Sequence, residues 1–315
     1  MPFKSLAGLK KLGTLDAEIV TLASYPSASV CAAFSSDPVK VAVFAFAGGQ
    51  PKVQQVSLDT CDAGALIDER VAVVKSGDTL WGLIDIQHKP KIEPIGRSMR
   101  GLFNNAGSNG ALALGWDGEG SELKLEGNEV VGRDFQLRGS IRTCSLDGVN
   151  CYVVADDGDG GGKFREHAGN TPEAGTQLRC DLPLAARRMT RLAGGPQLSA
   201  LTERGALEVC VIRKVGAAAL EAKMLGTQSA VVDVAVLEST LFVLSADGVL
   251  RVYGADALHR TGDGGQAVAT YELALGAEGV PTALAATSRG GNRLWIGTRD
   301  GEVFRCDCVK GSISL

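Results

Sequence analysis

Two stretches near the end of the chain share one pattern: LFVLSADGVLRVYGAD, which begins at Leu241, and LWIGTRDGEVFRCD, which begins at Leu294. In each stretch an apolar run leads to Asp-Gly, and a second alternating run follows. Asp-Gly supplies the positive φ angles that a tight hairpin turn requires. Each stretch therefore predicts a β-hairpin, and the question is whether the same hairpin builds the whole chain.

The hairpin pattern recurs five more times upstream. The seven predicted turn centres are Pro38, Gly77, Gly118, Gly158, Gly205, Gly248 and Gly301, separated by 39 to 53 residues. A regular period of this size indicates a repeat architecture. A short apolar run precedes each hairpin, and a more polar run follows each one except the last. The pattern predicts four strands per repeat, with the small apolar strand innermost and the polar strand outermost.

These observations predict an all-β fold, a seven-bladed β-propeller of four-stranded antiparallel blades in one domain spanning residues 1–315. The expected blades are 16–58, 59–97, 98–136, 137–182, 185–226, 229–275 and 279–309. We expect residues 3–9 to pair with 302–308 as the missing outer strand of the last blade, because ring closure removes an exposed sheet edge. The Ala-rich segment 216–225 has helix propensity but occupies an outer-strand position, where tertiary context can prevail.

The turns resemble those of WD-repeat propellers. Ser35-Ser36-Asp37, Ser245-Ala246-Asp247 and Thr298-Arg299-Asp300 match the Ser/Thr-x-Asp of that family, which gives Asp37, Asp247 and Asp300 a structural role in their turns. Tyr253 stands where a repeat tryptophan would be, and Cys306-Asp307 stands in place of Trp-Asp. The chain has no Gly-His pair before a first strand. The resemblance implies the propeller fold and leaves the partner open, since function belongs to sites on a fold.

Arginines gather in the connections into the third, fourth and fifth repeats. They are Arg97, Arg100, Arg138, Arg142, Arg187, Arg188 and Arg191, and the turns of the same repeats carry Asp117, Glu119, Asp156, Asp157, Asp159 and Glu203. One interpretation pairs arginines and acids internally. The other leaves some arginines to bind carboxylate or phosphate, for which the guanidinium is suited. Under the second interpretation, the partner-binding residues are Arg97, Arg100, Arg138, Arg187 and Arg188.

The sequence offers no catalytic constellation. The three histidines, His88, His167 and His259, are spread over three repeats at peripheral positions, where surface roles are expected. Asp157 and Asp159 are spaced as in a calcium loop, but the distal acid is misplaced. Cys306-x-Cys308 would be half of a zinc site with no second pair visible. We therefore expect no metal, no cofactor and no enzymatic activity.

Net charge, cysteine usage and the lack of targeting segments indicate where in the cell the protein is expected. The net charge of −4 gives no overall attraction to nucleic acid or membrane. The eight cysteines contain no C-x-x-C pair, several lie in apolar runs, and no secretory signal or membrane-length apolar stretch is present. These features predict reduced cysteines and an intracellular protein of the cytoplasm or nucleus, without membrane attachment.

The sequence favours a non-catalytic interaction scaffold, a subunit of an intracellular multiprotein complex that binds an acidic peptide or subunit on one face. An RNA or ribonucleoprotein binder is the first alternative. It is weakened by the aromatic content of 5%, which leaves few side chains to stack on bases. A propeller hydrolase or lactonase with its site at the channel mouth is the second alternative.

Overall fold

The computed structural model describes residues 3–24, 28–104, 110–115, 118–136, 141–146, 150–156, 162–168, 177–182, 185–191, 198–204, 206–215, 219–225, 230–237, 240–254, 266–276, 279–288 and 291–310. For the segments between 141 and 224 it describes the strands and their pairing. The described elements are all β-strands, and no helix occurs among them. This is an all-β protein.

Twenty-eight strands are described, most of them four to eight residues long. In chain order they are β1 (Phe3–Thr14), β2 (Ile19–Ala23), β3 (Val30–Ser35), β4 (Lys40–Ala45), β5 (Lys52–Gln55), β6 (Ala63–Asp68), β7 (Val71–Ser76), β8 (Thr79–Ile84), β9 (Lys91–Ser98), β10 (Gly101–Asn104), β11 (Ala111–Leu114), β12 (Glu119–Glu126), β13 (Glu129–Gln136), β14 (Ile141–Leu146), β15 (Asn150–Asp156), β16 (Gly162–Ala168), β17 (Gln177–Leu182), β18 (Ala185–Arg191), β19 (Leu198–Arg204), β20 (Ala206–Val215), β21 (Ala219–Met224), β22 (Val231–Leu237), β23 (Thr240–Ser245), β24 (Val249–Gly254), β25 (Ala269–Glu272), β26 (Pro281–Thr287), β27 (Arg293–Thr298) and β28 (Glu302–Lys310).

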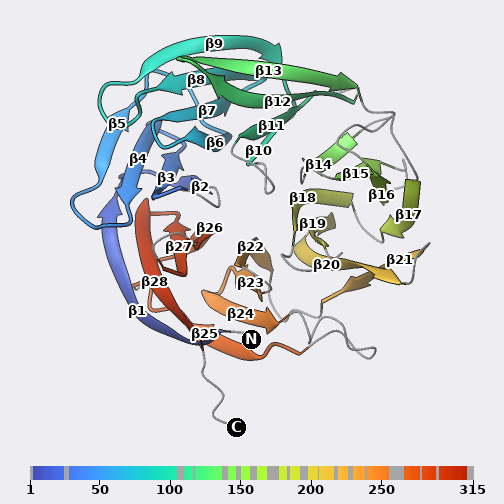
Figure 1. Cartoon of the computed structure of the whole chain (residues 1–315). Coiled ribbons are helices and arrows are strands. Elements are labelled where there is room, and N and C mark those ends of the chain that lie inside the picture. Colours follow the sequence, from blue (N-terminus) through green and yellow to red (C-terminus); the bar gives the residue numbers. More distant parts are fainter. Residues whose placement is uncertain are drawn as a thin grey trace.

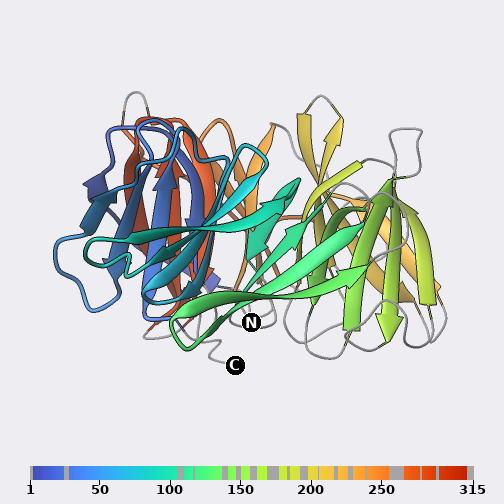
Figure 2. The ribbon, with the colours of Figure 1, turned by 90° about the horizontal axis from the view of Figure 1, so that it is seen from above.

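These strands form four-stranded antiparallel sheets, each built from consecutive strands. The orders are β2-β3-β4-β5, β6-β7-β8-β9, β10-β11-β12-β13, β14-β15-β16-β17, β18-β19-β20-β21, β22-β23-β24-β25 and β1-β28-β27-β26. We call them sheets 1 to 7 in that order. Figure 1 shows them standing around a common centre, and Figure 2 shows their strands running between two opposite faces. The arrangement is compatible with a propeller-like fold.

The first segment of the chain pairs with the last described strand. β1 runs antiparallel to β28, from Phe3 opposite Lys310 to Thr14 opposite Glu302. The expected pairing of this segment is therefore present, and the strand extends further than residue 9. The Ala-rich segment expected to be a strand contains β21, which pairs with β20 through Ala219 opposite Val215. Ser98 ends β9, so sheet 2 extends one residue past the approximate repeat boundary expected at 97.

Hydroxyl groups hold the turns that resemble Ser/Thr-x-Asp. The Ser35 hydroxyl donates to the Pro38 carbonyl at 2.8 Å and accepts the Lys40 N–H at 3.1 Å. The Thr298 hydroxyl accepts the Glu302 N–H at 3.0 Å. Both side chains are fully buried, so these bonds satisfy polar groups that water cannot reach.

The aspartates of the same turns differ in what they contact. Asp247 Oδ1 accepts the Val249 N–H at 3.2 Å, beside Gly248 with its φ of 78°. Asp37 precedes Pro38 through a cis peptide bond. Asp300 precedes Gly301, whose φ is also 78° and whose N–H donates to the Thr298 carbonyl at 3.1 Å. The turns at Asp37 and Asp300 are thus held by the hydroxyl groups of Ser35 and Thr298.

Among the described strands, six of the seven neighbouring pairs of sheets are linked at their first strands, and sheets 3 and 4 are linked through β11 and β14. β2 contacts both β6 and β26, β6 contacts β10, β14 contacts β18, and β22 contacts both β18 and β26. Specific hydrogen bonds join three of these pairs. The buried Asp233 carboxylate of β22 accepts the Leu284 N–H of β26 at 2.8 Å. Thr282 of β26 donates to the Ile19 carbonyl of β2 at 2.6 Å, and Thr21 of β2 accepts the Gly64 N–H of β6 at 3.3 Å.

The core lies between the sheets in separate apolar layers. Phe34 of sheet 1 packs on Gly64 of sheet 2, where an added Cβ would come within 2.4 Å of the phenyl ring. Between sheets 7 and 1, Trp295 stacks with Phe46 at a centroid distance of 5.4 Å. Sheets 1, 2 and 7 therefore bury both of their faces against their neighbours, which explains the nearly continuous apolar runs of their middle strands.

Candidate functional site

One face of the molecule carries both the entries into the first strands and the turns between the second and third strands. Main-chain hydrogen bonds join these two kinds of segment. Ser36 N donates to the Glu18 carbonyl at 3.1 Å, Ala246 N to Ala230 at 2.9 Å, and Arg299 N to Val280 at 2.8 Å. We call this side the entry face, and the side with the turns between first and second strands the opposite face.

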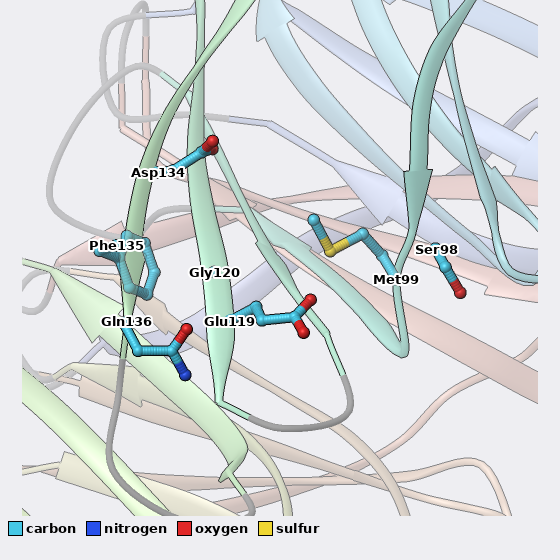
Figure 3. A pocket seen from close by; sticks show the side chains of 7 residues that line it. All are labelled: Ser98, Met99, Glu119, Gly120, Asp134, Phe135 and Gln136. Atoms are coloured by element: carbon cyan, nitrogen blue, oxygen red, sulfur yellow. The ribbon is translucent and has the colours of Figure 1, made fainter.

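A pocket of about 570 Å³ opens on the entry face between sheets 2 and 3. Figure 3 shows its lining residues, which are Ser98, Met99, Glu119, Gly120, Asp134, Phe135 and Gln136. They come from the end of β9, the start of β12 and the end of β13. Their strands bring them together from three separate parts of the sequence.

Main-chain bonds fix the walls of this pocket. Met99 N donates to the Asp78 carbonyl at 2.8 Å, which ties the connection to the turn of sheet 2. Arg100 N donates to Leu114 O at 2.7 Å, and Gly115 N donates to Glu119 O at 2.8 Å, within sheet 3. Main-chain hydrogen bonds therefore hold the segments around Met99 and Glu119 that form two sides of the pocket.

A glycine gives the pocket its shape. The Phe135 ring lies against Gly120, where an added Cβ would come within 2.1 Å of Phe135 Cε2. Gly120 and Phe135 are directly opposite each other in the β12–β13 ladder. Any larger residue at position 120 would displace the ring, so this glycine is required by close packing.

The pocket combines carboxylates with other polar groups and an apolar wall. Glu119, Asp134, Gln136 and Ser98 are exposed, while Met99 is only 3% exposed. In Figure 3 the Glu119 carboxylate extends from β12 toward the segment that holds Ser98 and Met99. Such a lining can accept hydrogen bonds and exclude water along one side, as polypeptide-binding surfaces do. Among the described residues, no three His, Cys, Asp or Glu side chains gather closely enough to hold a metal ion.

The structure places the predicted arginines at different kinds of position. Arg97 lies near the end of β9, and Arg100 lies just before β10, so the two bracket the pocket residues Ser98 and Met99. Arg187 and Arg188 lie inside β18 and not in the connection before it, and a register shift falls between Ala186 and Arg188. Arg138 lies outside the described residues. The arginines are therefore distributed over strands as well as connections.

The acidic residues proposed as their internal partners are also dispersed. Glu119 lines the pocket, Asp156 ends β15, and Glu203 stands opposite Ala185 in sheet 5. Asp117, Asp157 and Asp159 lie outside the described residues, as does most of the segment that resembles a calcium loop. The pocket residues Asp134, Phe135 and Gln136 were not predicted, because VVGRDFQL reads as an ordinary outer strand.

The described histidine and cysteine side chains considered in the sequence analysis have structural surroundings. His88 Nδ1 lies 2.9 Å from Asp85 Oδ1 on the surface, while His259 lies outside the described residues. Cys31, Cys61, Cys306 and Cys308 are free and buried. Burial raises the pKa of the Cys61 and Cys306 thiols to about 12, and it raises those of Cys31 and Cys308 as well. These four thiols are therefore protonated and function as core side chains.

Comparison with protein-family models and with curated proteins finds no match for this chain. The described residues include no helix long and apolar enough to cross a membrane. The site must accordingly be interpreted from its own residues.

Proposed function

We propose that this protein is a seven-bladed, WD-repeat-like β-propeller that acts as a non-catalytic interaction scaffold within an intracellular complex, in the cytoplasm or nucleus. The four-stranded sheets, the ring-like order of contacts between neighbouring sheets and the hydroxyl-held turns support this fold. In this proposal β1 closes the ring as the outer strand of the last blade, which leaves no long edge exposed.

The pocket on the entry face is the observation that carries the binding proposal. It is lined by polar groups from sheets 2 and 3 and is bracketed in sequence by Arg97 and Arg100. Arg187 and Arg188 are the third and fourth residues of β18, the first strand of sheet 5. The start of β18 lies on the same face, because Ala185 pairs with Glu203 next to the turn between β19 and β20. We infer that the partner is a protein segment whose acidic residues these arginines would contact by bidentate hydrogen bonds. The pocket carboxylates of Glu119 and Asp134 would accept hydrogen bonds from N–H groups of the same segment.

Non-catalytic binding is favoured over hydrolysis of the serine, cysteine or metal-dependent kind by the chemistry of the described groups. A serine or cysteine hydrolase needs a base beside its nucleophile, and a metallohydrolase needs a metal-bound water. The described pocket offers carboxylates, an amide and a hydroxyl on rigid strands, with no histidine in its lining. Its components suit hydrogen bonding to a peptide.

The test is a comparison of co-purifying proteins between three forms of the chain. One is the unaltered protein, one carries Arg187→Glu with Arg188→Glu, and the control carries Arg133→Glu on the outer strand β13. We expect the double variant to lose a stoichiometric partner while the control retains it, with equal melting temperatures. Retention of every partner by the double variant would contradict the proposal, and partners released by ribonuclease would favour the RNA-binding alternative.

A further inference from the structure

A second pocket opens on the opposite face, between the same two sheets. It measures about 380 Å³ and is lined by Arg70, Val71, Ile84, Asp85, Lys91, Leu125 and Asn128. Residues 28–104 and 118–136, which surround it, are all described. Its volume falls within the range of small-molecule pockets, which starts at about 300 Å³.

The floor of this pocket is aliphatic. Val71 is 4% exposed, and Ile84 and Leu125 are partly buried against the same apolar cluster. The cluster joins sheets 2 and 3 and includes Val73 and Leu123. A ligand that enters the pocket would therefore place an apolar group on Val71, Ile84 and Leu125, and burial of that group would favour binding.

The charged groups at the rim leave one cation available. Lys91 forms an ion pair with Glu93, and Asp85 Oδ1 contacts His88 Nδ1. The Arg70 guanidinium is exposed and has no hydrogen bond or ion pair with any described residue. Asn128, on the turn between β12 and β13, adds an amide to the rim. The free group is thus a planar donor that matches a carboxylate.

The turn that carries Arg70 is held in place by several contacts. Arg70 N donates to Asp68 Oδ1 at 3.1 Å, and the Arg70 carbonyl accepts Ile86 N at 2.9 Å. The preceding residue, Glu69, accepts the side-chain amide of Gln87 at its carbonyl at 3.0 Å, and its carboxylate accepts Ser29 N at 2.8 Å. The backbone of Arg70 is therefore fixed before a ligand arrives, which reduces the entropic cost of binding.

We propose that this pocket binds an apolar carboxylate, with the aliphatic part on Val71, Ile84 and Leu125 and the carboxylate on Arg70. The charged head needs an exposed donor at the rim, and the apolar part needs the floor beneath it. The same chemistry is offered by a free aliphatic acid and by a peptide that ends in an apolar residue. This site is separate from the pocket on the entry face.

The experiment titrates the full chain with hexanoate and follows binding by saturation-transfer NMR. For eight non-hydrogen atoms we expect a Kd on the order of 1 mM. Hexanol, which lacks the charge, should bind at least about tenfold more weakly, because a hydrogen bond to a charged group is stronger than a neutral one. Equal binding of hexanol, or no saturation by hexanoate, would overturn the proposal.

Three variants test whether the Arg70 side chain itself binds the carboxylate, as opposed to a general change in charge or folding. Arg70→Gln should raise the Kd for hexanoate about tenfold, since it removes the charge while keeping a polar side chain. Arg70→Lys should recover part of the affinity, and Arg133→Gln on β13 should leave the Kd unchanged. Melting temperatures check that all three remain folded. An unchanged Kd in Arg70→Gln would refute the role of Arg70.

Two peptides then distinguish the sources of the carboxylate. Acetyl-Gly-Gly-Leu with a free carboxylate and the same peptide with a terminal amide are compared in the same titration. Tighter binding of the free acid than of hexanoate would identify a peptide terminus as the source. Weaker binding of the peptide acid would identify a free small acid, and in both cases the amide should bind least. If the amide binds as tightly as the acid, the carboxylate assignment is wrong.

Discussion

Asp233→Ala should be among the most destabilising single substitutions in the described core. The Asp233 carboxylate is buried in β22 and accepts two main-chain N–H groups, from Val234 and from Leu284 of the next sheet, each at 2.8 Å. Both donor residues are fully buried. Truncation leaves these N–H groups without their acceptor, and each buried unsatisfied group costs about 1–3 kcal/mol.

We therefore expect a loss of about 3 kcal/mol in the free energy of unfolding. For a chain of 315 residues that corresponds to a fall in melting temperature of roughly 5 °C. Differential scanning calorimetry of the purified chain measures it. Asp247→Ala is the control, because Asp247 accepts the Val249 N–H at 3.2 Å in an exposed turn, where water can replace the lost acceptor, and it should cost under about 1 kcal/mol. Equal melting temperatures for the two variants would refute the inter-sheet role of Asp233.

Three further outcomes are expected. Deletion of residues 1–10 should lower the melting temperature sharply, because β28 loses most of its outer partner and because Leu6 and Leu9 are removed from the cluster they pack against. An unchanged melting temperature would contradict ring closure. Native protein at about pH 8 should leave Cys61 and Cys306 unlabelled by iodoacetamide until denaturant is added, since the pKa of each thiol is about 12 and only the thiolate reacts. Gly64→Ala should lower the free energy of unfolding by about 2 kcal/mol, because the added methyl group displaces the Phe34 ring. Urea unfolding measures this loss, and a stability equal to that of the unaltered chain would show that the ring has room to move.

The local sequence pattern was sufficient to predict the strands and turns. Ser35, Ser245 and Thr298 are fully buried at the turns where the repeat pattern placed them. The segment that contains β21 followed its position in the repeat and not its Ala-rich composition. These features depend on residues close in sequence and on the period, so the sequence contains the information directly.

The candidate site was predicted only in part. Arg97 and Arg100 pointed to the connection between sheets 2 and 3, and Glu119 was noted as a turn acid beside it. Asp134 and Phe135 carried no signal, because an outer strand with alternating polar residues is typical of any solvated edge. Their contribution arises from pairing with β12, where Phe135 covers Gly120.

The second pocket could not have been predicted at all. Arg70 belongs to a two-residue turn of sheet 2, while Leu125 and Asn128 belong to sheet 3, more than fifty residues later. The sequence by itself determined the repeat, the strands and the hydroxyl-held turns, because hydrogen bonding and side-chain alternation act over short distances along the chain. Only the tertiary structure decided which groups share a pocket, because the packing of one sheet against the next depends on side-chain shape across the interface.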